Sequence, residues 1–356
     1  MSRVKGGMAA TADSMEGLLA SRPGRALAFA GSFIVCLLAA GSLAITLFGH
    51  PYGPVASLDL PAPPSAKSAA LSAAPVSGAD AVTGPVTKPI YAGAALIADP
   101  ALVENTAAGP LPRIADDGRK PMTAYAAPAP ANAKFKIAIV VDGLGISASA
   151  TKAALAALPA AVTLGFAPYA GDVGQWASQA RRKGHEVLLE IPMEPFDFPD
   201  SDPGPHTLRA GADEDANIQR LVWALTRFTG YAGVTNLLGQ RFLSDSDALS
   251  PALTYLGRRG LYFFDNGGAS QSVAAAVAGQ VGIPAAQGAP IDTIQTALEI
   301  DRRLSDLETQ ARAHGSAVGS AFLYPVSVAR ITAWAKGLQS RGFALVPVSA
   351  IVTPSK

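Results

Sequence analysis

The 356-residue sequence contains little sulfur, little imidazole and no excess of charge. Its one cysteine, Cys36, excludes an internal disulfide and a cysteine-based zinc cluster. The 28 Lys and Arg residues are balanced by 27 Asp and Glu residues without a dense basic run, which argues against a nucleic-acid partner. No GxGxxG or GxxxxGKS/T motif follows a predicted strand, so the usual nucleotide fingerprints are missing. None of the four histidines lies at the end of a predicted strand, and the sequence has no GxSxG motif. Both observations disfavour serine–histidine catalysis.

One long apolar run is present near the N-terminus. Between Arg25 and His50 lie 24 residues without a charge, enough for a helix to span a hydrocarbon core of about 30 Å. Lys and Arg precede the run and none follows until Lys67, so the positive-inside rule places residues 1–25 in the cytoplasm. A cleaved signal peptide is the alternative, but its apolar core would be about 7–15 residues. We expect a single-pass anchor over 26–49 in the bacterial inner membrane, with the C-terminal domain in the periplasm.

Residues 50–134 have the composition of a linker. Positions 51–134 hold 14 prolines and 23 alanines and show no helical or strand period. Such a segment cannot bury enough apolar surface to offset the entropy of ordering it. The sequence therefore predicts a disordered Pro/Ala-rich spacer, followed by one folded domain over 135–356.

From residue 135 onward, short apolar runs alternate with helical patterns. The runs are 137–141, 162–166, 186–191, 232–238, 261–265, a weak one at 283–286, 317–322 and 344–348. Helices are predicted over 213–228 and over 292–313, the second opening at Asp292 with Ile294, Leu298 and Leu307 on its inner side. Apolar strands separated by helices predict a parallel sheet covered on both faces. Seven or eight units in about 220 residues predict an α/β fold of the (β/α) barrel type, complete or missing one strand, with an open doubly wound sheet as the alternative.

Polar residues follow several of these runs, where the carboxyl ends of parallel strands gather. Asp142 follows the first strand and is either a functional acid or an Asx-type turn residue. Glu190 lies within the third, where an unpaired carboxylate costs several kcal/mol unless it faces a partner, a cation or solvent. Glu194 could face the same site, or the two glutamates could be one salt bridge and one exposed loop acid. The candidate substrate-binding residues at the other strand ends are Asn236, Arg241, Asp265 and Tyr324.

The same segments resemble a known family. KIAIVVDGLGIS, ARRKGHEVLLEIPMEPFDFPDSDPGPHTL, TGYAGVTNLLGQRF, RGLYFFDN, GSAVGSAFLYPVSVARI and GFALVPVSAI are similar, in this order, to the divergent polysaccharide deacetylases of bacterial envelopes. The resemblance covers nearly all of 135–356. It implies a deformed (β/α) barrel and N-acetylated glycans, such as peptidoglycan, as the substrate class.

The resemblance also shows where this chain departs from active polysaccharide deacetylases, to which the family is distantly similar. Their first strand ends in an Asp-Asp pair, one a catalytic base and one a ligand of a divalent metal that two histidines also bind. Here the pair reads Asp142-Gly143, and the two histidine positions are Glu190 and Glu194. Similar sequences keep further histidines where this chain has Leu237 and Ser320. The resemblance implies Asp142 as the catalytic residue, without the usual zinc ligands.

Three acids remain that could bind a metal ion: Asp142, Glu190 and Glu194. Oxygen ligands suit Mg²⁺, Mn²⁺ or Ca²⁺ better than Zn²⁺. Without a metal, three close acids would repel one another and at least one would stay protonated. Two hypotheses follow: a metal-assisted hydrolase of N-acetyl groups, with Arg241 steadying the oxyanion, or a non-catalytic module that holds a glycan or a protein partner. A purely structural tether would leave the acids unexplained.

Overall fold

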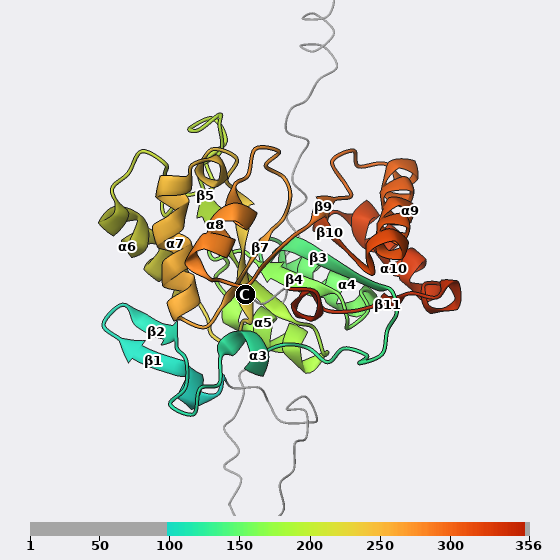
Figure 1. Ribbon diagram of the computed structural model, residues 1–356, viewed down its shortest axis with the longest axis horizontal. Helices are drawn as coiled ribbons and strands as arrows, with labels where there is room; N and C mark the ends of the chain where they lie inside the picture. The colour runs from blue at the N-terminus through green and yellow to red at the C-terminus, as the bar shows by residue number, and fades with distance from the viewer. Residues whose placement is uncertain (1–97, 353–356) are drawn as a thin grey trace, which may run out of the picture. The chain divides into compact units, whose positions relative to one another are not determined.

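The apolar runs form a parallel sheet in the computed structural model, which describes residues 98–352 (Figure 1). Seven of the strands are β3 (Lys136–Leu144), β4 (Thr163–Phe166), β5 (Val187–Met193), β6 (Gly233–Leu238), β7 (Tyr262–Asp265), β8 (Ala285–Gln287) and β9 (Ala289–Pro290). The last two are β10 (Ser316–Phe322) and β11 (Ala344–Leu345). Their order is β8-β7-β6-β5-β4-β3-β10-β9, and β11 also pairs with β3.

The two ends of this sheet are joined by a single residue. β8 and β9 lie at opposite ends of the strand order, yet only Gly288 separates them along the chain. The Gly288 N–H donates to the Asp265 carbonyl at 2.8 Å, and the Ile291 N–H donates to the Ser320 carbonyl at 2.9 Å. One interrupted strand thus nearly closes the sheet into a barrel. The predicted parallel barrel is confirmed, and the open doubly wound alternative is wrong.

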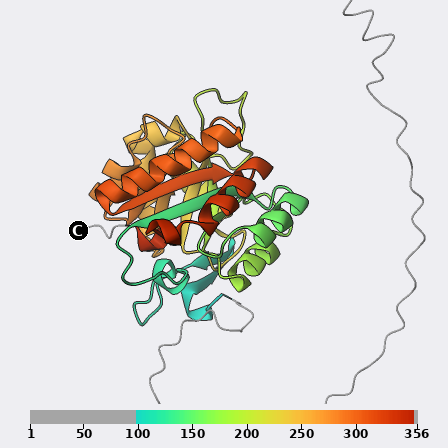
Figure 2. The same cartoon turned by 90° about the vertical axis from the view of Figure 1, so that its right-hand side faces the viewer.

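Helices follow the strands and cover the outside of the barrel. They are α4 (Ala148–Ala157), α5 (Val173–Arg182), α6 (Glu214–Leu225), α7 (Ser246–Arg258), α8 (Ala274–Val281), α9 (Ala297–His314) and α10 (Pro325–Lys336). The predicted helix 213–228 is α6, whose N-cap Asp213 accepts a hydrogen bond from the Ala216 N–H at 2.8 Å. Figure 2 shows α9 in orange and α10 in red beside β10 and β3.

The start predicted for α9 is wrong. The helix begins at Ala297, after the N-cap Thr296, and buries Ile300, Leu304, Leu307 and Ala311. That spacing puts Leu298 on the opposite face, where it is 83% exposed, and Ile294 lies before the helix and is 56% exposed. Only Leu307 of the three residues predicted for the inner side is buried, because Asp292 belongs to the barrel mouth and not to the helix.

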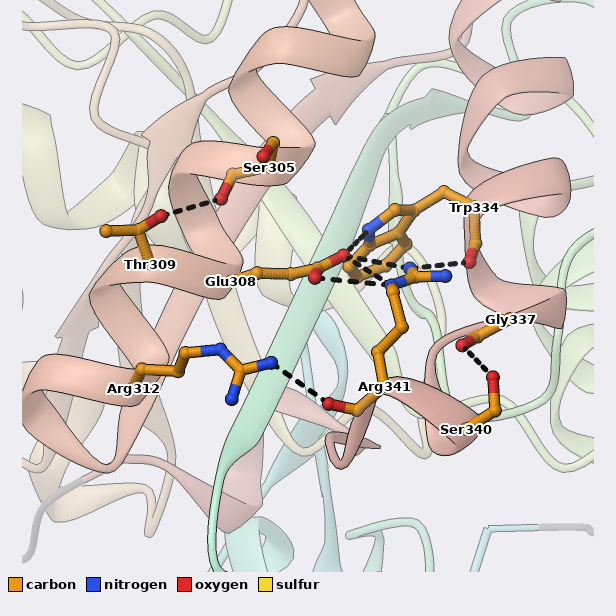
Figure 3. Close-up of polar contacts among 8 residues, drawn as sticks. All are labelled: Ser305, Glu308, Thr309, Arg312, Trp334, Gly337, Ser340 and Arg341. Carbon is orange, nitrogen blue, oxygen red and sulfur yellow. Dashed lines mark hydrogen bonds and ion pairs between the residues drawn. The ribbon is translucent and has the colours of Figure 1, made fainter.

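One acid crosslinks α9 to α10 and to the turn that follows it (Figure 3). Glu308 on α9 accepts hydrogen bonds from Trp334 Nε1 at 2.7 Å and from Arg341 Nη2 at 2.8 Å. The Arg341 carbonyl accepts from Arg312 Nη2 at 3.1 Å. These contacts fix α10 against α9 on the outer face of the barrel.

Side chains along each strand alternate between the helices outside and the barrel interior. In β3, Ile137, Ile139 and Val141 pack outward among the helices. The interior is filled by Ala138, Val140, Leu188, Tyr262, Phe264 and Val318, among others. Asp142 continues the inward face of β3, and Glu190 continues the inward face of β5 set by Leu188, so the strand period brings both acids to one end of the barrel.

Another buried acid, Glu186, lies at the opposite end of the barrel, where the strands begin. Glu186, directly before β5, is fully buried and accepts hydrogen bonds from the Ala127 N–H at 3.1 Å, Tyr262 Oη at 2.9 Å and the Ser349 N–H at 3.1 Å. The Thr163 and Ser349 hydroxyls also donate to it. The pKa of Glu186 lies above its usual value because the carboxyl is buried, and the hydrogen bonds from Ser349, Ala127 and Tyr262 offset part of this effect. Through these hydrogen bonds, Glu186 holds the segments around Ala127 and Ser349 against this end of the barrel.

The folded part of the chain begins earlier than predicted. A short 3-10 helix (Pro100–Leu102), the hairpin of β1 (Val103–Thr106) and β2 (Gly109–Pro112), and α3 (Pro121–Ala124) precede the barrel and are drawn in cyan in Figure 1. The predicted linker boundary at 134 is therefore too late. Leu102 and Tyr125 are buried, and the Arg181 guanidinium stacks over the Tyr125 ring at 4.4 Å. Such irregularly spaced anchors give no periodic signal in a Pro/Ala-rich segment.

The predicted anchor at 26–49 lies outside the described residues, as do 1–25 and 50–97. Within 98–352, no helix combines the length and the apolar character required to cross a membrane.

Candidate functional site

Two buried acids lie close together at the carboxyl end of the barrel. Asp142 is 5% exposed and Glu190 is 0% exposed. They come from β3 and β5, and β4 lies between these strands. A Cβ at Gly165 of β4 would lie 2.1 Å from Asp142 Oδ1, so only glycine leaves room for this carboxyl. Glu190 Oε1 accepts a hydrogen bond from the Gly143 N–H, which joins the two acids through the turn after Asp142.

Burial makes both acids reluctant to ionise. Desolvation raises the pKa of Asp142 to about 7; the Asn266 side chain lowers it and the charge of Asp292 raises it. Desolvation and then the charge of Asp142 raise the pKa of Glu190 well above its usual range, against the effect of the Gly143 N–H. Two buried carboxyls of like charge cannot both ionise cheaply. At neutral pH the pair therefore holds at least one proton.

A cavity of about 190 Å³ opens above the two acids. Its polar lining consists of Asp142, Glu190, Asn236, Gln240, Asn266, Asp292 and Ser320. Asn236 and Asn266 bind each other reciprocally. The Asn266 N–H donates to Asn236 Oδ1 and Asn266 Nδ2 to the Asn236 carbonyl, both at 2.9 Å, and Asn236 Nδ2 donates to Asn266 Oδ1 at 3.0 Å. The cavity lining within the described residues contains no lysine or arginine.

Three buried acceptor atoms, all of them in residues that line the cavity, have no hydrogen-bond partner in the described part of the chain. They are Asp142 Oδ1, Glu190 Oε2 and Gln240 Oε1, all of them buried. Buried polar atoms normally have partners, and an unpaired one costs about 1–3 kcal/mol. Three such atoms in residues around one cavity favour a ligand with hydrogen-bond donors, although Asp142 Oδ1 itself packs against Gly165.

Asp292 is a site residue that the sequence analysis assigned to a helix start. Its Oδ2 atom accepts from the Phe322 N–H at 2.8 Å and from Ser327 Oγ at 2.7 Å. The pKa of Asp292 lies above its usual value because the carboxyl is buried, and these hydrogen bonds offset part of this effect. The signal that could have found it is its position just after β9, but this strand is too short and too weakly apolar to be recognised. Asn266, directly after β7, also lines the cavity and is not among the predicted site residues.

The predicted site residues divide into two groups. Asp142, Glu190 and Asn236 line the cavity. Glu194 does not: its Oε2 accepts from the Ala210 N–H at 2.8 Å, and its Oε1 pairs with Arg241 Nη1 at 3.2 Å. Arg241 is likewise absent from the cavity lining. Both residues hold a loop in place after β5, which matches the salt-bridge alternative for Glu194.

The other two substrate-binding candidates also lie elsewhere. Asp265 shares the outward face of β7 with Phe263; its carboxyl accepts from the Gly267 N–H at 2.9 Å and from Gln287 Nε2 at 3.1 Å. It lines a separate cavity between β7, β8 and α8. Tyr324, the N-cap residue of α10, lines a groove beside the acid cavity.

The residues present do not fit a resident metal ion. In the part of the chain that the structure describes, no group of three His, Cys, Asp or Glu side chains is arranged to hold one. Glu194, the third acid of the predicted metal site, is engaged by Ala210 and Arg241. The predicted three-carboxylate site is thus wrong in its third member. The third carboxyl at the cavity is Asp292, and its Oδ2 atom is engaged by the Phe322 N–H and Ser327 Oγ. Structural or catalytic zinc needs at least three protein ligands.

The chain is similar to several known proteins. Residues of this chain are 26% identical over 203 residues to the uncharacterized protein YibQ of Escherichia coli K12, covering 54% of this chain and 60% of YibQ. An uncharacterized protein of Haemophilus influenzae is 24% identical over 204 residues, covering 57% and 72%. The chain thus spans about three fifths of YibQ.

A solved structure is more similar. The crystal structure of an uncharacterized protein from Agrobacterium tumefaciens C58 is 42% identical, with a TM-score of 0.67, covering 68% of this chain and all of the other. Residues 139–352 match the family described as divergent polysaccharide deacetylase. Three of the positions where that resemblance expects histidine, 190, 237 and 320, line the acid cavity. The chain belongs to the divergent polysaccharide deacetylase family.

Proposed function

We propose that this protein binds an N-acetylated glycan of the bacterial cell envelope in the cavity over Asp142 and Glu190, without a resident metal ion. One observation carries the proposal: three buried acceptors, Asp142 Oδ1, Glu190 Oε2 and Gln240 Oε1, lack donors around a single cavity. A sugar supplies O–H and amide N–H donors in one compact ligand. The family's carbohydrate-related character agrees with this choice of ligand.

The acid pair suits such a ligand chemically. With at least one of the two carboxyls protonated, Asp142 and Glu190 together offer an O–H donor and carboxyl acceptors toward a sugar. The reciprocal Asn236–Asn266 pair fixes the neighbouring wall, so the polar groups are in place before the ligand arrives. Because no Lys or Arg among residues 98–352 lines the cavity, we expect a neutral sugar rather than a phosphorylated one.

The proposal includes the location of the protein. The apolar run at 26–49 would anchor the chain in the inner membrane, and the Pro/Ala-rich residues after it would carry the barrel into the periplasm. Cell-envelope glycan, peptidoglycan included, would then be within reach of the barrel mouth.

Hydrolysis of N-acetyl groups is the second candidate, and one observation favours it. The pKa of Asp142, raised to about 7, suits a group that accepts or donates a proton at neutral pH. However, Arg241, the residue expected to steady an oxyanion, is paired with Glu194 away from the cavity. Without a cation to stabilise the developing charge, binding is the better-supported function.

Titration calorimetry with chitotetraose, on the full-length protein in detergent and with EDTA present, tests the proposal. We expect binding that survives the chelator and weakens at least tenfold in Glu190→Gln. The one amide oxygen would stay on the Gly143 N–H, and the amide nitrogen, which cannot accept a hydrogen bond, would take the place of Oε2. Glu194→Gln is the matched control and should keep the wild-type affinity, since Glu194 does not line the cavity. Binding that requires a divalent ion, or that is equal in both variants, would contradict the proposal.

An acetate-release assay on the same samples separates the two candidates. Glycan binding alone predicts no acetate with Mg²⁺, Mn²⁺, Ca²⁺ or Zn²⁺ added. Release of acetate that disappears in Asp142→Asn would instead establish the hydrolase.

A further inference from the structure

The large apolar side chains that are exposed in the described part of the chain all lie at the mouth end of the barrel. They are Ile146, Tyr169, Phe196, Leu238, Ile294 and Leu298. Each one lies at the end of a barrel strand, in the loop that follows it, or in the first turn of the next helix. Exposed apolar side chains scattered singly need no explanation, but a set confined to one face marks a contact surface.

Three of these residues line one groove. The groove has a volume of about 670 Å³, and its apolar lining includes Ile146, Tyr169, Leu238, Phe322 and Tyr324. It adjoins the acid cavity, because Leu237, Leu238, Asp292 and Phe322 line both. The cavity that holds the acid pair therefore continues into this groove, and apolar atoms make up most of the exposed lining of both.

Leu238 stands at the junction and has an unusual backbone. Its φ is 57°, and within residues 98–352 it is the one non-glycine residue with a positive φ. A leucine in the left-handed region costs about 1 kcal/mol or more and persists where the surroundings impose it. The Leu238 carbonyl accepts a hydrogen bond from Asn236 Nδ2 at 2.7 Å, which helps to hold this conformation. The strained residue joins the cavity wall to the groove.

We propose that the groove receives the acyl chain of an acylated glycan whose sugar occupies the acid cavity. This inference rests on the proposed glycan binding and narrows its ligand to an amphipathic saccharide. Apart from Asp202, Asp292, Thr293 and Gln295, the groove offers few partners for the hydroxyl groups of a plain oligosaccharide. Its side chains Ile146, Leu238 and Phe322 would instead pack against an acyl chain. A phospholipid headgroup is disfavoured, because no Lys or Arg of the described part of the chain lines the cavity or the groove.

The test compares two ligands that share one sugar. Chitotetraose carrying a single N-octanoyl group in place of one N-acetyl group is titrated into the full-length protein beside chitotetraose itself. Each buried methylene is worth about fourfold in affinity. We expect the octanoyl ligand to bind at least tenfold more tightly, which corresponds to burial of about two methylenes.

Two matched variants locate the acyl contact. Ile146→Ser removes an exposed side chain that lines the groove, and Leu298→Ser removes one that does not. We expect Ile146→Ser to reduce the ratio of the two affinities at least threefold and Leu298→Ser to leave the ratio unchanged. Both positions are exposed, at 62% and 83%, so neither change disturbs the core.

The outcomes separate this inference from the proposed function. Equal affinities for the two ligands would overturn the acyl site while leaving glycan binding intact. Failure of both ligands to bind would remove the proposed function as well. An equal loss in both serine variants would show a general apolar surface and overturn the acyl groove.

Discussion

Asp142→Asn should stabilise the protein at neutral pH, although it alters the proposed site. The pKa of Asp142 rises from 3.8 to about 7 in the folded state, mainly because the carboxyl is buried. Between these two pH values the unfolded chain releases a proton that the folded chain retains. The folding stability contributed by this group is therefore complete below about pH 4 and is lost as the pH rises to about 7.

The size of the effect follows from the shift. At about 1.4 kcal/mol for each pH unit, the loss reaches at most about 4 kcal/mol. Asparagine has nearly the same shape and does not titrate. The variant should thus gain on the wild type by up to about 4 kcal/mol between about pH 4 and about pH 8. Removing the Asp142 charge also relieves Glu190, which changes stability in the same direction.

Urea unfolding of the full-length protein, followed by tryptophan fluorescence, measures this difference. The three tryptophans, Trp176, Trp223 and Trp334, all lie in the barrel region, so the signal reports on the barrel. Asp200→Asn, a change at an exposed loop position, is the control and should show no such pH-dependent gain. The reasoning would be refuted if the free energies of unfolding of Asp142→Asn and wild type differed by the same amount at about pH 4 and at about pH 8.

Three further substitutions test the frame around the site. Gly165→Ala should displace the Asp142 carboxyl, which lies 2.1 Å from the added Cβ; calorimetry should show weaker chitotetraose binding, and urea unfolding a loss of about 1–3 kcal/mol. Glu186→Gln should cost about 1–3 kcal/mol in urea unfolding, because its amide nitrogen would face donors that now bind a carboxyl oxygen; an unchanged midpoint would show that this network is unimportant. Glu308→Ala should lower stability by about 1 kcal/mol and redshift the fluorescence of the barrel, and high salt should not reproduce the whole loss because one of the bonds comes from a neutral indole.

The barrel could be predicted from the sequence because its strands are short apolar runs of the expected length. Period-two alternation also explains why Asp142 and Glu190 were placed correctly: each continues the inward face of its strand. The same rule explains the failures. Asp265 belongs to the outward face of β7, and Glu194 lies beyond the end of β5, where the chain has turned toward Arg241.

Other features left no pattern that the sequence analysis could use. The closing strand is interrupted at Gly288 and is only weakly apolar, so neither the closure of the barrel nor Asp292 beside it could be recognised. The hairpin at 103–112 packs through a few irregularly spaced side chains in a Pro/Ala-rich segment. Gln240 and Asn266 lie in loops after β6 and β7 and line the cavity because of the way these loops fold. Loop conformation depends on packing, which the spacing of residues in the sequence does not reveal.

A crystal structure of the full-length protein soaked with chitotetraose tests the central claim most directly. The account predicts one sugar ring over Asp142 and Glu190, with its O–H or N–H groups donating to Asp142 Oδ1, Glu190 Oε2 or Gln240 Oε1. Density for a metal ion between the two acids, or for a sugar bound at another surface while this cavity holds only water, would contradict it.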